Sequence, residues 1–320
     1  MAAEMLPLPP PPAPPIDHQD GLLGEGRQAC RWIDTHCHLD AAEYAPDREA
    51  VVHRAFAAKV GQIVIPAVDC ANFATVRDLA HRHGLSYALG IHPMCVDRAD
   101  DTALERLRAE LFEHRDDPRL VAVGEIGLDH FIAGLDRVRQ ARYLAAQLKL
   151  AAEFDLPVLL HVRQAIDSVL KLLRQQPVRR GIAHAFNGSE QQADAFTALG
   201  FKLGFGGALT FDRALRIRGV ARAVPLEAIV METDSPDIAP QWLYRTAAAR
   251  ASGATMRNES SELPRIGAEL AGLRGIDAAA LCRATTANAL DCLPRLAALQ
   301  AMSSSGVGDG PTRDARAGPR

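Results

Sequence analysis

The chain has 320 residues, of which 48% are hydrophobic, and its formal net charge is −3. This composition suffices for a large buried core, and the length suits one α/β barrel domain of about 250 residues with extensions. The near-zero charge argues against a basic surface for bulk nucleic-acid binding. It leaves room for a nucleic acid held locally by metal ions and a few arginines.

The six cysteines form no Cys-x-x-Cys pair, which suits reduced thiols better than a disulfide framework. No apolar run approaches the roughly 18 residues of a membrane span. The N-terminus lacks the basic and apolar regions of a secretory signal. These features predict a cytoplasmic protein without membrane contact, and nothing in the sequence indicates an obligate protein partner.

Only the middle of the chain is predicted to fold. Residues 1–30 contain a proline run that ends at Pro15, which favours extended polyproline and predicts a disordered leader. Residues 301–320 are mostly small and polar, which predicts a disordered tail. The remaining residues, 31–300, are predicted to form a single domain.

Within this domain, eight short β-type runs alternate with amphipathic helical stretches. The predicted strands are Trp32–His36, Gln62–Val68, Tyr87–Ile91, Leu120–Glu125, Val158–His161, Gly181–Ala185, Phe201–Phe205 and Ala228–Glu232. Such alternation makes strands parallel, and eight of them favour a closed (β/α)8 TIM barrel. An open doubly wound sheet would need a glycine-rich phosphate loop after the first strand, where this chain has His36-Cys37-His38.

Metal-type side chains fall at the carboxyl-terminal ends of these strands. Four histidines and two carboxylates are candidates, namely His36, His38, Glu125, His161, His184 and Asp234. They follow strands 1, 4, 5, 6 and 8, and a TIM barrel carries its chemistry at this end. Imidazole with carboxylate suits Zn²⁺ or Mn²⁺, whereas Mg²⁺ prefers oxygen, so the identity of the metal stays open.

One tetrahedral ion would leave two of the six candidates unused, so the sequence predicts two divalent metal ions. We expect the first ion on His36, His38 and Asp234, the second on His161 and His184, and Glu125 between them. Two divalent cations less two carboxylates leave two positive charges, which a metal-bound hydroxide and a phosphodiester oxyanion would neutralise. Glu125 and Asp234 are therefore predicted catalytic residues, with Asp234 as the general base.

Three further residues are predicted to face the substrate. His92 follows the third strand and could donate to a phosphate or to the leaving group, or could merely cap its loop. Arg163 lies two residues beyond His161 on the same strand face, where it could hold phosphate or pair with a neighbouring acid such as Asp167. Asn187 begins a turn that could aim a backbone N–H inward. A cluster of arginines, Arg213, Arg216, Arg218 and Arg222, could guide a nucleic-acid backbone or simply face solvent.

Several motifs together resemble one known family. They are Ile33-Asp34-Thr35-His36-Cys37-His38-Leu39-Asp40, Gly90-Ile91-His92-Pro93, Gly124-Glu125-Ile126-Gly127-Leu128-Asp129, Pro157 to Arg163, His184 to Ser189, Glu232-Thr233-Asp234-Ser235-Pro236, Arg257-Asn258-Glu259 and Thr285 to Ala289. In this order and spacing, over about 31–293, they resemble the TatD family of metal-dependent hydrolases. Neither tail belongs to the match.

The resemblance implies a barrel-fold, divalent-metal-dependent nuclease that trims DNA from a 3′ end. It places the family's ligands on the same six residues and implies substrate roles for His92 and Arg163. Two positions depart from the usual pattern: His130-Phe131 replaces an aromatic pair, and Ser260 replaces a proline. Both departures bear on substrate preference and not on the metal ligands.

The sequence therefore predicts a 3′-5′ exonuclease that hydrolyses phosphodiester bonds at single-stranded DNA ends. A narrow barrel mouth admits a strand terminus more easily than a duplex. An alternative on the same metal pair is ester or amide hydrolysis, as in D-aminoacyl-tRNA deacylation, which some relatives are reported to perform. A barrel kept only as a binding module is disfavoured, because all six ligand positions are intact.

Overall fold

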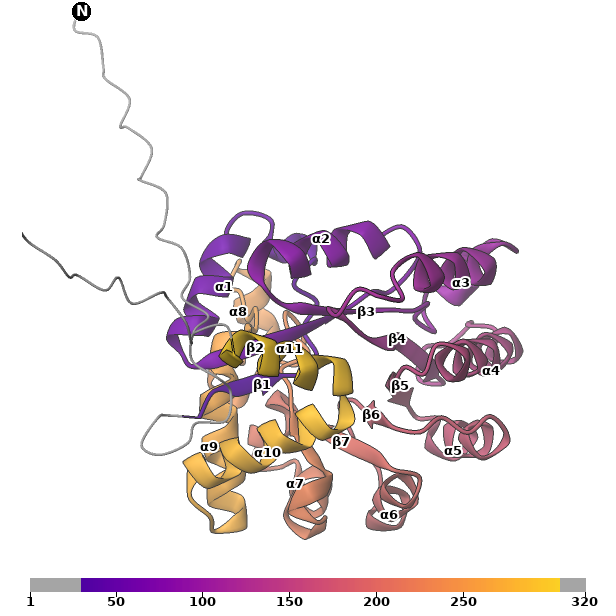
Figure 1. Cartoon of the computed structure of the whole chain (residues 1–320). Helices are drawn as coiled ribbons and strands as arrows, with labels where there is room; N and C mark the ends of the chain where they lie inside the picture. Colours follow the sequence, from indigo (N-terminus) through magenta and orange to yellow (C-terminus); the bar gives the residue numbers. More distant parts are fainter. Residues whose placement is uncertain (1–29, 306–320) are drawn as a thin grey trace, which may run out of the picture.

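The computed structural model describes residues 30–305. Eight strands form one sheet in sequence order, and each pairs in parallel with the next. They are β1 (Trp32–Asp34), β2 (Val60–Pro66), β3 (Ser86–Leu89), β4 (Leu120–Asp129), β5 (Val158–Arg163), β6 (Gly181–Ala183), β7 (Phe201–Phe205) and β8 (Ile229–Met231). The sheet closes because Thr35 N donates to Met231 O at 3.1 Å and Cys37 bridges to Ser235. The predicted TIM barrel is confirmed (Figure 1).

Helices surround the strands in Figure 1 and cover their outer faces. Those that link successive strands are α1 (Arg48–Ala57), α2 (Phe73–His83), α3 (Ala103–Glu113), α4 (Arg137–Glu153), α5 (Ile166–Gln175), α6 (Glu190–Ala198) and α7 (Leu215–Ala223). After β8 come α8 (Ala247–Ala251), α9 (Leu263–Arg274), α10 (Ala278–Cys292) and α11 (Pro294–Ser305). Apolar residues between strands and helices form the larger core, as the alternating pattern predicts.

The last two helices close the amino-terminal end of the barrel. Asn288 Nδ2 donates to Ile229 O at 2.8 Å, Cys292 Sγ to Gly181 O at 3.3 Å, and Arg295 Nη1 to Leu120 O at 3.1 Å. These carbonyls belong to the first residues of β8, β6 and β4. A second apolar cluster fills the barrel interior against α10 and α11, so this end is packed and the functional site must lie at the other end.

All eight predicted strands are present, but their carboxyl-terminal ends differ. Both β1 and β6 end two residues earlier than predicted, at Asp34 and Ala183, whereas β4 continues to Asp129. Just past the strand ends, Ala185 and Asp234 adopt positive φ angles of 45° and 52°, a conformation that extended pairing cannot continue. The chain therefore leaves the sheet at the positions where most of the candidate ligands occur.

The predicted tail at 301–320 needs one correction, because α11 continues to Ser305. The stretch Leu296 to Met302 is rich in alanine, leucine, glutamine and methionine, which favour helix. The predicted leader lies outside the described residues except for Cys30, as does the tail beyond Ser305. Cys37, Cys70, Cys95, Cys282 and Cys292 are free thiols in the described residues, and no helix there is long and apolar enough to cross a membrane.

Candidate metal centre

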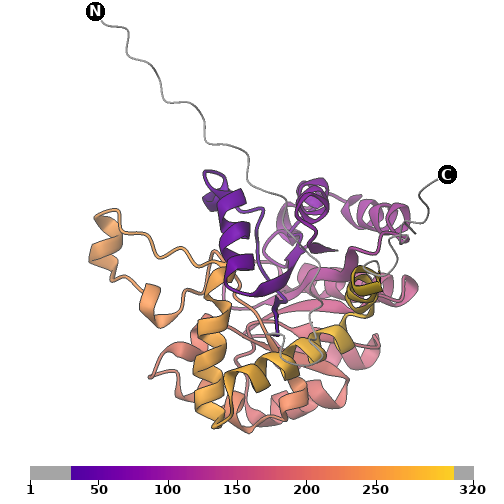
Figure 2. The ribbon, with the colours of Figure 1, turned by 60° about the vertical axis from the view of Figure 1, so that its left-hand side comes forward.

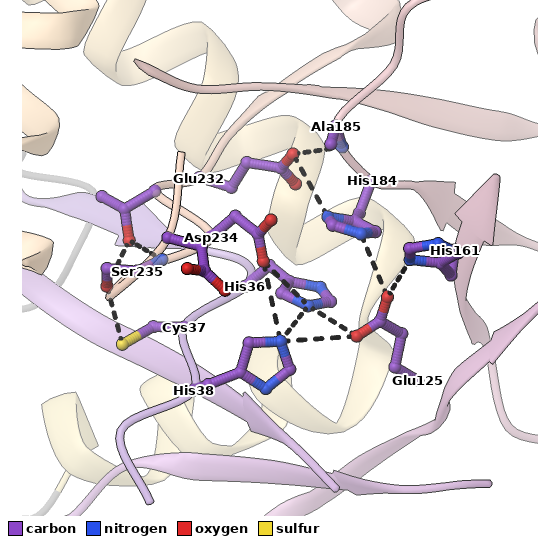
Figure 3. Close-up of polar contacts among 12 residues, drawn as sticks. His36, Cys37, His38, Glu125, His161, His184, Ala185, Glu232, Asp234 and Ser235 are labelled. Atoms are coloured by element: carbon purple, nitrogen blue, oxygen red, sulfur yellow. Dashed lines mark hydrogen bonds and ion pairs between the residues drawn. The ribbon is translucent and has the colours of Figure 1, made fainter. Parts of the chain in front are cut away.

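All six candidate ligands meet at the carboxyl-terminal end of the barrel (Figure 3). Most of them line a cavity of about 1380 Å³, formed by the loops that follow the strands. Close approach of β4 and β5 brings Glu125 beside His161. Gly127 pairs with His161 in the sheet, and a Cβ on Gly127 would lie 1.9 Å from His161 O. Only glycine allows this spacing of the two strands.

Glu125 lies at the centre of the site and is 1% exposed. Its Oε2 atom is 3.1 Å from His36 Nε2 and 3.4 Å from His38 Nε2. Its Oε1 atom faces the opposite group, at 2.8 Å from His161 Nδ1 and 3.0 Å from His184 Nε2. Each carboxylate oxygen therefore contacts a different pair of the four candidate histidines, which is the arrangement expected of a carboxylate that bridges two metal ions.

Asp234 completes the first group. Its Oδ1 atom is 3.6 Å from Nε2 of both His36 and His38, and its backbone N donates to His36 O at 2.9 Å. His36 Nε2 and His38 Nε2 are only 3.3 Å apart. Lone pairs of nitrogen and oxygen thus converge on one point, which is unfavourable unless a proton or a cation lies between them.

Electrostatics of the site fit a cation. Burial by itself would raise the pKa of Glu125, but attraction by His92, His36 and His184 outweighs it and holds that pKa well below the usual range. Burial likewise opposes a charge on His38, yet the hydrogen bond to Glu125 and the nearby carboxylates raise its pKa to about 9. A site that attracts positive charge this strongly, with imidazole and carboxylate ligands, suits divalent metal ions.

His161 and His184 present different ring nitrogens to Glu125, and a buried carboxylate lies behind each ring. Asp129 Oδ2 accepts from His161 Nε2 at 3.1 Å, so the proton of neutral His161 lies on Nε2 and the Nδ1 lone pair faces Glu125. Burial raises the pKa of Asp129, but the hydrogen bonds from His161 and from backbone amides lower it to about 2.

Glu232, which the sequence did not predict as a site residue, lies behind His184 at ion-pair distance and not at hydrogen-bond distance. Its Oε1 atom accepts from Ala185 N and lies 3.7 Å from His184 Nδ1. Gly204 leaves the space that the carboxylate needs, because a Cβ there would lie 2.1 Å from Glu232 Oε2. The available signal was the alternation in Glu232-Thr233-Asp234, which places both carboxylates on one face.

A third buried carboxylate, Asp34, ties the end of β1 to the chain after β8. Its Oδ2 accepts from Thr233 Oγ1 at 2.6 Å, and its Oδ1 accepts from Thr233 N at 3.0 Å and His36 N at 3.3 Å. Burial raises the pKa of Asp34 to about 7, although these hydrogen bonds oppose the shift. The backbone that carries His36 and His38 is thus held against the backbone that carries Asp234.

His92 lies closer to the candidate ligands than a residue that only contacts substrate would need to. Its Nε2 is 3.2 Å from Glu125 Oε1 and 3.1 Å from His161 Nδ1. Its Nδ1 accepts from Met94 N at 3.1 Å, so a neutral ring must carry its proton on Nε2. Burial lowers the pKa of His92, which favours this neutral form. In this form His92 points an N–H into the site and is a hydrogen-bond donor. Its ligand atom nevertheless lies within 4.8 Å of those of Glu125 and His161, close enough for the three to hold a metal ion.

The other predicted substrate residues line the same cavity. The Arg163 guanidinium lies 3.9 Å over the ring of Phe131 and 4.0 Å from Asp129 Oδ2, and not beside Asp167 as the sequence alternative proposed. Asn187 Oδ1 accepts from Arg216 Nη2 at 3.1 Å, so the side chain and not only the turn is engaged.

Comparison with known proteins agrees with this geometry. The family model of TatD related DNases matches residues 33–294. The chain belongs to this family. Among curated relatives, the uncharacterized metal-dependent hydrolase YjjV of Escherichia coli is 44% identical over 211 residues, which cover 65% of this chain and 81% of YjjV. The crystal structure of YjjV, a TatD homolog, matches with a TM-score of 0.76 at 39% identity, covering 83% of this chain and 98% of YjjV.

A further relative carries a more specific name. The 3′-5′ ssDNA/RNA exonuclease TatD of Shigella flexneri is 31% identical over 263 residues, covering 80% of this chain and 96% of that protein. The resemblance inferred from the motifs is therefore confirmed, and the chain is a member of a family of metal-dependent hydrolases.

Proposed function

We propose that this protein is a divalent-metal-dependent phosphodiesterase that removes nucleotides from the 3′ ends of single-stranded DNA. One observation carries the proposal: one oxygen of Glu125 lies beside His36 and His38, and the other lies beside His161 and His184. The name of the Shigella flexneri relative supports a single-stranded nucleic acid as substrate. The free thiols of Cys37, Cys70, Cys95, Cys282 and Cys292 favour a reducing compartment such as the cytoplasm.

In this proposal, His36, His38 and Asp234 would hold one ion, His161 and His184 would hold the other, and Glu125 would contribute to both. When bound, two divalent ions lower the pKa of a nucleophilic water and stabilise charge on the phosphoryl oxygens. Mn²⁺, Zn²⁺ and Mg²⁺ remain the candidates, with the four imidazoles favouring the first two.

The side chains around the ions orient the substrate and move protons. Asp234 is 15% exposed at its side chain and faces the cavity, so its carboxylate can take a proton from the attacking water. His92 directs its Nε2–H into the same space, where it can donate to the leaving oxygen or to a phosphoryl oxygen. Arg163 and Asn187 lie on the cavity wall and are placed to contact the phosphate and the sugar.

Arginines of the cavity wall can contact an anionic phosphodiester, although Asp40, Glu43, Asp167 and Asp237 line the cavity as well. Arg98, Arg163 and Arg216 all line it. Among these, only Arg163 has a carboxylate within 4.0 Å in the described residues. Arginines without an acidic partner at the mouth of a site attract an anionic chain.

The proposal is tested by trimming of end-labelled single-stranded DNA, with the label on either end to give the polarity. The parent is compared with Glu125→Gln, and with Glu105→Gln, an exposed carboxylate on α3, as a control. We expect chelator-sensitive release of nucleotides by the parent and the control, and a loss of at least about a thousandfold in Glu125→Gln. A parent that binds divalent metal but leaves DNA intact would contradict the proposal. D-aminoacyl-tRNA and simple esters would then be the substrates to assay.

A further inference from the structure

A segment after β8, residues 239–256, projects from the barrel and is called the arm here (Figure 2). It begins directly after Ile238, which lines the cavity. The arm includes the 3₁₀ helix η5 (Gln241–Leu243) and α8. It contains no aspartate or glutamate but does contain Arg245 and Arg250. The metal centre uses none of these residues, so their exposure and charge require a separate explanation.

The base of the arm is firmly held. Asn258 Nδ2 donates to Thr233 O at 2.9 Å, Asp237 O at 3.0 Å and Ile238 O at 3.3 Å, which joins the two ends of the excursion. Gln241 N donates to Thr210 Oγ1 at 2.8 Å, which fixes the arm to the loop after β7. The arm therefore starts from a defined position at the rim of the cavity.

Two aromatic side chains meet at this rim. The rings of Phe211 and Tyr244 pack edge to face, with centroids 5.9 Å apart and planes at 86°. Tyr244 is 43% exposed. Phe211 follows the cavity-lining Ala208 by three residues, which span at most about 11 Å. The pair therefore lies near the edge of the cavity.

Arginines flank the aromatic pair and have no acidic partners. Arg213 and Arg245 are exposed, and neither has a carboxylate within 4.0 Å among residues 30–305. Arg245 Nη1 donates to the carbonyls of Trp242 and Tyr244, at 3.3 and 3.0 Å, which holds the guanidinium next to the tyrosine. Some arginines elsewhere pair with acids, for example Arg106 with Asp100 at 2.9 Å and Arg257 with Asp47 at 2.6 Å. Others, such as Arg98 and Arg216, have no carboxylate within 4.0 Å in the described part of the chain, so the rim is distinguished by its arginines lying beside an exposed aromatic ring.

We propose that Phe211, Arg213, Tyr244 and Arg245, together called the rim, bind the part of a single-stranded DNA substrate that lies away from the scissile phosphate. The inference rests on the proposed function and adds a second contact region to it. A base stacks on the exposed face of Tyr244, and the two arginines contact neighbouring phosphates. Unpaired cations beside an exposed aromatic match single-stranded nucleic acid in both charge and shape, whereas a duplex hides the faces of its bases.

The test uses Tyr244→Ala/Arg245→Ala and a matched control, Phe112→Ala/Arg115→Ala. In the control pair, Arg115 lies 4.4 Å over the ring of Phe112, which is 55% exposed at the end of α3, near the start of β4 and far from the cavity. Binding of labelled dodecathymidylate is measured by fluorescence anisotropy in chelator, which separates binding from hydrolysis. We expect the rim variant to raise Kd about tenfold or more, and the control and Tyr244→Phe to leave it within about twofold.

Two further readouts separate the rim from a structural effect. Replacing Arg213 and Arg245 with alanine should reduce the slope of log K against log salt by about 1.4, since each phosphate contact contributes about 0.7 for a single strand. In turnover, the rim variant should raise KM for the dodecamer at unchanged kcat, and should leave both constants unchanged for a dinucleotide.

The outcomes distinguish failure of the rim proposal from failure of the proposed function. Equal dodecamer binding and equal KM in parent and rim variant, with the parent active, would overturn the rim alone. A parent that cleaves no oligonucleotide while the rim variant still weakens dodecamer binding would overturn the nuclease reaction and support the rim. A duplex that binds as tightly as the single strand, with the same loss in the variant, would overturn base stacking on Tyr244.

Discussion

Replacing Asp129 with asparagine should specifically weaken the second metal position. The carboxylate accepts from Phe131 N at 2.9 Å and Ile132 N at 3.0 Å through Oδ1, and from His161 Nε2 through Oδ2. An asparagine that keeps the two backbone bonds must turn its NH₂ group toward His161. That nitrogen cannot accept, so His161 would move its proton to Nδ1, the atom that faces Glu125.

The size of the effect follows from this conflict. If His161 keeps its lone pair at Nδ1, its Nε2–H must point at the NH₂ group of the introduced asparagine. Two donors then face each other in a buried site, and neither has an acceptor. Flipping the amide would instead set its NH₂ against two backbone N–H groups. An unsatisfied buried donor costs about 1–3 kcal/mol, which corresponds to a loss of about 5- to 150-fold in affinity. This range agrees with the 10- to 100-fold typical of carboxylates that orient metal-bound histidines.

Titration of metal-free protein with Mn²⁺ by calorimetry provides the assay. We expect two Mn²⁺ binding events, of which one has a lower affinity in Asp129→Asn than in the parent. The affinity of the other event, assigned to His36, His38 and Asp234, should stay within about threefold of the parent value. The control is Asp136→Asn, because Asp136 caps α4 by accepting from Val138 N and Arg139 N, and asparagine caps equally well. Nitrogen NMR of the imidazoles reports the tautomer directly. If both Mn²⁺ affinities are unchanged, or if His161 keeps its Nε2 proton in a folded variant, Asp129 does not control metal binding through the His161 tautomer.

Three other predictions concern stability. Divalent metal at about 100 times its Kd should stabilise the protein by about 2.7 kcal/mol and raise Tm by about 5–10 °C, and chelator should reverse the shift in a thermal scan. Gly204→Ala should destabilise by about 1–3 kcal/mol in urea unfolding, since its Cβ would meet Glu232, whereas Gly219→Ala in α7 meets nothing within 4 Å and should be neutral or stabilising. Asn258→Ala leaves three carbonyls without their donor and should cost about 2–4 kcal/mol, with faster proteolytic cleavage in the arm.

The sequence was sufficient to locate the candidate site because the fold imposes a simple rule. In a parallel barrel every strand ends at the same face, so polar residues at strand ends must lie together. Glu125, His161 and the other four candidates were found in this way, although most of the strand ends were displaced by one to four residues. Arg163 lines the cavity, as predicted. The alternative named Asp167 as an example of an acidic neighbour, but the nearby acid is Asp129.

The barrel and the six polar residues at its carboxyl-terminal end could be predicted from the sequence. Hydrophobic periodicity and the order of the strands are read along the chain and need no knowledge of tertiary contacts. Tertiary structure decided which nitrogen of each histidine faces Glu125, why His92 donates, and that Glu232 stands behind His184. A histidine tautomer depends on the partner of its second nitrogen. For His161 that partner is Asp129, which lies 32 residues away along the chain. The carboxylate beside His184 Nδ1 belongs to Glu232, 48 residues away, so only the folded barrel brings these groups together.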